Sequence, residues 1–117
     1  MNRTKRDDAR EKFTQRIHDW AARLEVNVQA VTIRKMRTKW ASCSTAGRLT
    51  FDEALLSKSF ELQDYVILHE LLHVSVPNHG KLWKSLMRAH LGDYEIYEKE
   101  LKTQAKKAQL QIPATGS

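Results

Sequence analysis

The segment HELLHVSVPNH, residues 69–79, places three histidines and one glutamate among apolar residues. At about 100° per residue on a helical wheel, His69 and His73 share one face and Glu70 flanks them. The opposite face carries Ile67, Leu68, Leu71 and Leu72. Two imidazoles one turn apart, beside a carboxylate and backed by an apolar face, are what a zinc site on a core helix requires. The pattern therefore predicts a metal site that activates water.

A third ligand is expected from His79, which lies six residues after His73. A continuous helix would point His79 elsewhere, but Pro77 cannot continue a helix and disfavours helical geometry at Val76. A chain that turns back there can return His79 to the metal and leave the fourth position for water. The acids at 95, 98 and 100 could replace His79 in this role, although a solvated helix face also explains them.

Zinc lowers the pKa of a water ligand to about 7 and polarises a peptide carbonyl. Glu70 is then expected to take the proton and pass it to the leaving amine, as a general base and not a ligand. Neutral imidazoles also bind other divalent transition ions, so the residues alone do not fix zinc. Two alternatives are histidines packed in a core and a structural zinc. Histidines packed in a core would leave buried polar groups in need of partners. A structural zinc site usually has four protein ligands that include cysteines, and this segment contains none.

The elements that must position these residues follow from periodicity. Apolar residues recur every three or four positions from 7 to 24, which predicts an amphipathic helix. Residues 28–36 favour a strand, ASCSTAG a turn, and RLTFDEALL a second strand that runs into a loop or short turn. The two strands are expected to pair antiparallel around the small-residue connection.

The helix that carries the motif is expected over residues 62–76. Asn78 is a candidate N-cap for a third helix that ends near Gly92, and Asp93 is expected to cap the last helix. Residues 113–117 are expected to fray. The prediction is a single α+β domain over 1–117, with an N-terminal helix, a small mostly antiparallel sheet, the active-site helix and two C-terminal helices.

Length and composition limit the class of protein. A chain of 117 residues forms one domain, and no apolar run approaches the ~20 residues that span a bilayer, so no membrane partner is expected. The charged N-terminus does not resemble a signal peptide. The single cysteine, Cys43, cannot form an internal disulfide. These features favour a reducing compartment, with the cytoplasm as the default.

The positive charge is concentrated in one segment. The net charge is +6, and residues 31–50 contain no Asp or Glu. The basic residues there are Arg34, Lys35, Arg37, Lys39 and Arg48. This stripe could attract nucleic acid or acidic peptides, or it could be a solvated strand face. A nucleic-acid-associated binding module with a structural metal is therefore the alternative function.

Other candidate residues give weaker signals. His18 is expected at the surface, and His90 is expected to pack or cap its helix. Cys43 is expected to be a small buried residue and not a nucleophile. Trp83 is expected in the core and as a wall beside His79. Two arginines of the basic stripe, at 37 and 48, are candidate partners for the oxyanion formed during hydrolysis.

Two longer segments resemble a known family. RTKWASCSTAGRLTFDEALL and DYVILHELLHVSVPNHGKLWKSL are similar to the YgjP-like metal-dependent hydrolases, and through them to the SprT and WLM zinc peptidases. The resemblance covers about residues 31–91, with Ala41 in place of the usual glycine and Leu82 in place of the usual phenylalanine.

The resemblance implies a minimal zincin fold, with His69, His73 and His79 as zinc ligands and Glu70 as the catalytic base. The expected activity is zinc-dependent peptide-bond hydrolysis, with the substrate extended along a sheet edge within residues 31–51. Likeness to SprT also allows a protease that acts on DNA-bound proteins.

Overall fold

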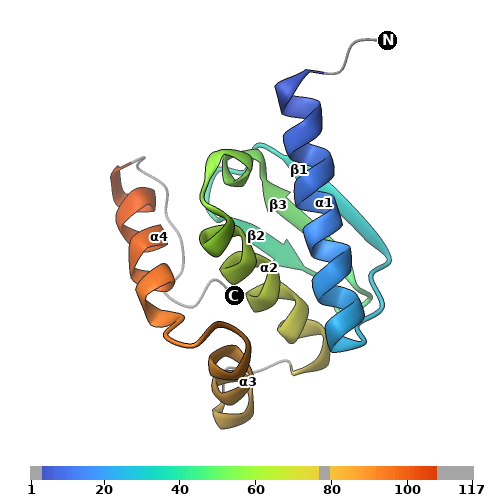
Figure 1. The fold of residues 1–117 in the computed structure, drawn as a ribbon, viewed down its shortest axis with the longest axis vertical. Helices are drawn as coiled ribbons and strands as arrows, with labels where there is room; N and C mark the ends of the chain where they lie inside the picture. Colours follow the sequence, from blue (N-terminus) through green and yellow to red (C-terminus); the bar gives the residue numbers. More distant parts are fainter. Residues whose placement is uncertain (1–3, 77–79, 108–117) are drawn as a thin grey trace.

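The computed structural model describes residues 4–76 and 80–107. Within them, four α-helices and a short 3-10 helix accompany a three-stranded sheet (Figure 1). In chain order the elements are α1 (Lys5–Leu24), β1 (Ala30–Arg34), β2 (Ala41–Cys43), β3 (Arg48–Asp52), η1 (Glu53–Ser57), α2 (Phe60–Ser75), α3 (Lys81–Leu91) and α4 (Glu95–Lys107). In Figure 1, α1 and α4 lie on opposite sides of α2. The predicted α+β class is confirmed.

The N-terminal helix α1 forms as its periodicity predicts. Its buried residues are Phe13, Ile17, Trp20 and Ala21, one apolar stripe on a charged helix. A capping box fixes its start: the Thr4 hydroxyl accepts a hydrogen bond from the Asp7 amide, and the Asp7 carboxylate accepts one from the Thr4 amide. Phe13 then packs edge-on against Phe51 of β3, with ring centroids 5.1 Å apart. These contacts anchor α1 to the sheet.

The sheet is mixed, so the prediction of a mostly antiparallel sheet was wrong. Its strand order is β1-β3-β2, in which β1 pairs parallel with β3 and β2 pairs antiparallel with β3. The segment predicted as a turn splits into two parts: residues 41–43 form β2, and residues 44–47 make the tight turn into β3. The hairpin of β2 with β3 leaves the other edge of β3 open, and β1 pairs there in parallel orientation.

Gly47 closes this hairpin in a conformation that suits glycine. Its φ is +86°, and a Cβ there would lie 2.5 Å from the Asn27 carbonyl oxygen. The Gly47 carbonyl also accepts a hydrogen bond of 2.9 Å from the Gln29 amide. The hairpin turn is therefore held against the chain that enters β1, which fixes the position of β2.

The motif helix α2 begins two residues earlier than predicted and ends one residue earlier. The Ser59 hydroxyl caps it by accepting a hydrogen bond from the Leu62 amide at 3.3 Å. The proposed helix stop, Pro77, and the proposed ligand His79 lie outside the described residues. Asn78 also lies outside them, and Gly80 is the N-cap of α3, so the prediction of Asn78 as N-cap was wrong.

The last two helices form where the sequence predicts, but each begins later than its predicted cap implies. Gly92, with φ of +64°, ends α3, as the sequence indicates. The helix α4 begins two residues after Asp93. The tail at 113–117, predicted to fray, lies outside the described residues. Among the residues that the structure describes, no helix is long and apolar enough to cross a membrane.

Asp64, in the first part of α2, joins that helix to α1. Its carboxylate accepts two hydrogen bonds from the Arg16 guanidinium, at 3.1 and 2.7 Å, and one from the Trp20 indole at 2.9 Å. This bidentate, charge-assisted contact sets the rotation of α2 about its axis. That rotation decides which side chains of α2 face the core and which face the site.

Candidate active site

The two faces of α2 differ in chemistry, as the helical wheel predicts. Ile67, Leu68, Leu71 and Leu72 are at most 1% exposed. On the other face, His69 and Glu70 are each 4% exposed, and His73 is half-buried. The ring centroids of His69 and His73 lie 4.8 Å apart, with the ring planes at 67°. The sequence-predicted imidazoles therefore lie together, beside a buried carboxylate.

A contact between neighbouring side chains orients His69. Its Nδ1 lies 3.1 Å from Oε2 of Glu70. In the tautomer with the proton on Nδ1, that nitrogen donates to Glu70, and the lone pair that binds a metal is on Nε2. Such a hydrogen bond to a carboxylate makes imidazole a better ligand.

Aromatic rings form a wall behind the two imidazoles. The ring of Trp83 in α3 packs edge-on against the His69 ring, with centroids 5.1 Å apart, and its centroid lies 6.2 Å from that of His73. Tyr65 lies one turn before His69, with ring centroids 5.8 Å apart, and its ring stacks on that of Tyr94 with centroids 6.4 Å apart. The prediction that Trp83 lies in the core is confirmed, because its exposure is 3%. Its predicted place beside His79 stays a prediction, because His79 lies outside the described residues.

Tyr65 ties the site to α4. Its hydroxyl donates a hydrogen bond of 3.3 Å to Oε2 of Glu98. Burial and the nearby Glu98 carboxylate raise the pKa of Tyr65, so the hydroxyl remains a donor at neutral pH. The sequence analysis did not single out Tyr65. Its position four residues before His69 was the available signal, because residues at that spacing share a helix face.

Cys43 comes to the site from the end of β2. Its thiol forms a hydrogen bond with the Glu70 carboxylate. Burial, the charge of Glu70 and this hydrogen bond raise the pKa of Cys43 to about 12, and the Lys39 ammonium opposes the shift. The thiol is therefore protonated and donates to Glu70. The sequence analysis missed this contact because nothing local links residues 43 and 70.

The acids considered as replacements for His79 are engaged elsewhere. Glu95 forms an ion pair of 2.7 Å with Arg88, Glu98 accepts from Tyr65, and Glu100 accepts from Gln104. Within residues 4–76 and 80–107, no three His, Cys, Asp or Glu side chains are grouped for a metal ion. On this face of α2 the described residues provide two imidazoles.

The donor set of this face fits a transition-metal ion. Two imidazoles lie one helical turn apart, a carboxylate orients one of them, and an aromatic wall holds both. Imidazole nitrogens are typical ligands of zinc and other divalent transition ions. The remaining histidines have other surroundings: His18 is exposed, and His90 packs edge-on against Trp20 at 5.6 Å, as predicted.

The comparisons with known proteins agree with this chemistry. Residues 1–104 match the family model described as YgjP-like, metallopeptidase domain. The chain belongs to this family. Its structure is similar to that of the metallopeptidase zymogen of Methanocaldococcus jannaschii, jannalysin, at 28% identity and a TM-score of 0.68. That match covers 80% of this chain and 95% of jannalysin.

A second solved structure shares the fold. The metallopeptidase zymogen of Pyrococcus abyssi, abylysin, matches with a TM-score of 0.69 at 21% identity, over 86% of this chain and 99% of that one. No curated protein matches this sequence. Membership of the family makes the protein a metallopeptidase and implies a catalytic metal. The alternative of a binding module with a purely structural metal is not favoured.

Proposed function

We propose that this metallopeptidase hydrolyses peptide bonds with a zinc ion held by His69, His73 and His79, and with Glu70 as the general base. The observation that carries the proposal is the buried polar face of α2. There, two imidazoles 4.8 Å apart lie next to a carboxylate that is 4% exposed. Two imidazoles one helical turn apart beside a carboxylate are the arrangement that a zinc site on a helix uses, and a metal site gives each of these groups a role.

The chain's own residues supply positioning and proton transfer. Bound zinc would polarise the substrate carbonyl and make water acidic. Glu70 accepts the proton of the attacking water on its carboxylate and delivers it to the leaving amine. Hydrogen bonds from Cys43 and from Nδ1 of His69 hold that carboxylate in place. Trp83 and Tyr65 keep the imidazole rings from turning.

The substrate is proposed to bind along β2. This strand lies against α2 and pairs with β3 on one side, and the described residues contain no strand on its other side. Its end brings Cys43 to Glu70. An extended peptide can add main-chain hydrogen bonds to such an edge, which would place its backbone beside the base.

The basic stripe favours a second candidate, a peptidase that acts on DNA-bound proteins. Four of its five residues are exposed and Lys39 is half-buried. If this is correct, DNA affinity falls steeply with salt, and neutralising Arg34, Lys35, Arg37 and Lys39 flattens that dependence. Affinity that does not change with salt would count against this candidate. On sequence grounds the proposed compartment is the cytoplasm, where the lone Cys43 would stay reduced.

Metal content tests the proposed site most directly. The protein, purified without a histidine tag, would be assayed for metal per chain in wild type, Glu70→Gln, His79→Ala and the exposed-histidine control His18→Ala. We expect near-stoichiometric zinc in wild type, Glu70→Gln and His18→Ala, and weaker binding in His79→Ala. Unchanged zinc in His79→Ala would remove that residue from the ligand set. A wild type that takes up no metal after reconstitution would contradict the proposed centre.

A further inference from the structure

Two segments of the chain lack acidic residues. Residues 31–50 hold five Lys/Arg and no Asp or Glu, and residues 71–92 hold three Lys/Arg and no Asp or Glu, so their formal charges are +5 and +3. The basic residues of the second segment are Lys81, Lys84 and Arg88. Residues 101–117 likewise hold three lysines and no acid. The first two segments contain β2 and α3, which adjoin the candidate site.

Both segments border the proposed active site. The first contains β2, whose Cys43 contacts Glu70 and lies within the electrostatic influence of Lys39. The second contains Trp83, which packs against both imidazoles of α2. Lys84 adjoins Trp83 in α3 and is exposed. Lys39 thus precedes the strand that reaches the site, and Lys84 follows the tryptophan that packs on the imidazoles.

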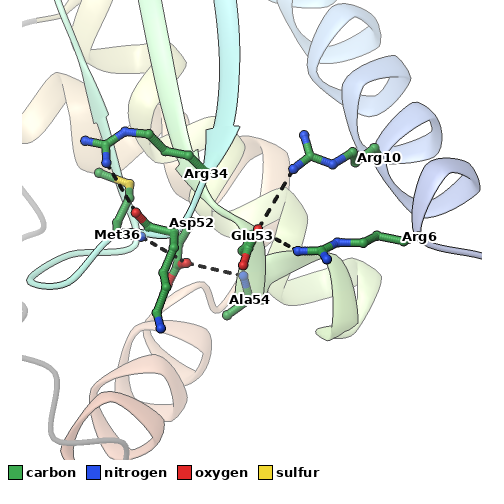
Figure 2. A network of polar contacts seen from close by, with 8 residues as sticks. Arg6, Arg10, Arg34, Met36, Asp52, Glu53 and Ala54 are labelled. Carbon is green, nitrogen blue, oxygen red and sulfur yellow. Dashed lines mark hydrogen bonds and ion pairs between the residues drawn. The ribbon is translucent and has the colours of Figure 1, made fainter.

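The carboxylates nearest to the basic stripe are already engaged. Figure 2 shows Arg6 and Arg10 of α1 reaching Glu53, with the Arg6 ion pair at 2.7 Å. Asp52 is buried and accepts hydrogen bonds from the amides of Met36 and Ala54 (Figure 2). Glu53 therefore pairs with α1, and Asp52 is hydrogen-bonded to backbone amides and, among the described residues, forms no ion pair with the stripe.

The flanking cations lack ion-pair partners in the part of the chain that the structure describes. No carboxylate there lies within ion-pair distance of Arg34, Lys35, Arg37, Lys39, Arg48, Lys81 or Lys84. Arg88 is the exception, because it pairs with Glu95. A cleft bordered by one sign of charge concentrates ligands of the other sign.

We infer that the active site selects acidic peptides, in which Asp or Glu residues flank the bond to be cleaved. This inference rests on the proposed peptidase function and names its substrate class. A peptide extended along β2 carries its side chains past Lys39 on one side of the site and towards Lys84 on the other. Carboxylates on the peptide supply the counter-charges that the chain itself does not.

A peptide fits this surface better than a nucleic acid does. The open edge of β2 offers main-chain amide donors and carbonyl acceptors, and an extended peptide can pair with both kinds of group. A phosphate backbone carries acceptors only, so the β2 carbonyls would gain no partner. The cations also border the catalytic groups, where they act on the segment that is cleaved.

Matched peptides test the inference. Three internally quenched peptides of equal length would carry Glu, Gln or Lys at the positions that flank one cleavage site. Cleavage would be followed in wild type, Lys39→Gln, Lys84→Gln and the control Lys12→Gln. Lys12 serves as the control because it lies far from the site, next to η1 and Phe60. Phe60 is the first residue of α2, about 20 Å along the helix axis from His73.

We expect kcat/KM at low salt to be roughly fivefold or more higher for the Glu peptide than for the Gln peptide, and lowest for the Lys peptide. This preference shrinks at high salt and in Lys39→Gln and Lys84→Gln, and it persists in Lys12→Gln. Equal cleavage of all three peptides by an active enzyme would overturn the inference and leave the peptidase function intact.

Binding separates this inference from the proposed function. If metal-loaded wild type cleaves none of the peptides, the peptidase proposal fails for them, and affinity is then measured with fluorescent uncleavable versions. Tighter binding of the Glu version, weakened by Lys39→Gln and Lys84→Gln, supports the acidic-peptide surface. Equal binding of the Glu and Gln versions overturns it. Tighter binding of duplex DNA than of the Glu peptide, with the same dependence on both lysines, would also overturn it.

Discussion

The helices α1 and α2 pack against each other, yet they bury different kinds of residue. The four buried residues of α1 are all apolar. The buried set of α2 includes three polar residues, Gln63, His69 and Glu70, among its leucines. Histidine occurs on both helices, but His18 of α1 is exposed and His69 of α2 is buried.

This comparison suggests two roles: the buried apolar residues of α1 stabilise the fold, and the buried polar residues His69 and Glu70 of α2 serve the proposed reaction. Burying a polar side chain costs free energy unless it finds a hydrogen-bond partner. Gln63 finds one inside the fold, where its amide donates to the Leu55 carbonyl at 2.9 Å. Glu70 contacts Cys43 and His69, which are themselves parts of the site. Changes on the α2 face are therefore expected to affect activity, and changes on the α1 face to affect stability.

Glu70→Gln gives the largest expected effect. A positioned general base contributes about 10²–10⁴-fold, so kcat/KM for peptide cleavage should fall by about a thousandfold while the protein stays folded and binds metal. Steady-state kinetics and thermal unfolding measure the two properties. Glu53→Gln, which removes a surface ion pair with Arg6, is the matched control and should keep its activity. Activity within tenfold of wild type in Glu70→Gln would exclude it as the base.

Metal removal should destabilise the protein through α2. A ligand that binds only the folded state adds about 4 kcal/mol when its free concentration is a thousandfold above Kd. Chelation should therefore lower the unfolding temperature of wild type, and restored zinc should raise it again. In His73→Ala the response to zinc should be much smaller. A wild type whose unfolding temperature is the same with and without chelator would contradict a metal bound to the folded state.

Ile17→Ala tests the α1 face. Ile17 is fully buried, so its truncation should lower the free energy of unfolding by about 2–5 kcal/mol, as measured by urea denaturation. At temperatures well below unfolding, zinc content and kcat/KM should match wild type. The neighbouring change His18→Ala should alter stability by less than about 0.5 kcal/mol. A loss of metal in folded Ile17→Ala would show that the two helices do not divide their roles in this way.

Cys43 should have the smallest effect, visible only at high pH. Its pKa is raised from 9.0 to about 12, so the folded state holds the proton more tightly than the unfolded state. The contribution to stability is complete below pH 9 and is lost as the pH rises towards 12. Urea unfolding of the metal-free protein at pH 8 and pH 10.5 should show a larger decrease for wild type than for Cys43→Ala. The difference is modest because the thiol is only half-buried. An equal decrease in the free energy of unfolding in wild type and Cys43→Ala would rule out a contribution of the raised Cys43 pKa to stability.

Thiol labelling tests the contact between Cys43 and Glu70 independently. At pH 8, alkylation of Cys43 in the folded metal-free protein should be at least about tenfold slower than in denaturant, because the thiolate is the reactive form. Labelling at equal rates in the two states would contradict a protonated thiol beside Glu70.

The sequence by itself determined the helices and the face of α2 that carries the two imidazoles and the carboxylate. The periodic apolar residues of α1 and α2 specify which faces are buried, because residues three and four positions apart share a face. The same spacing joins His69, Glu70 and His73 within one element, so no long-range contact was needed to find them. The assignment of His79 remains a proposal, because its prediction depended on a turn that no local pattern specifies.

Only the tertiary structure decided the sheet topology and the remaining contacts of the site. Only the fold shows that β1 pairs parallel with β3 on the edge opposite β2, because strand pairing depends on partners far apart in the chain. The hairpin of β2 with β3 carries Cys43 to Glu70, 27 residues away in the chain, and α3 brings Trp83 to the imidazoles. Local periodicity fixes which face a residue occupies, whereas packing between distant segments fixes what that face touches.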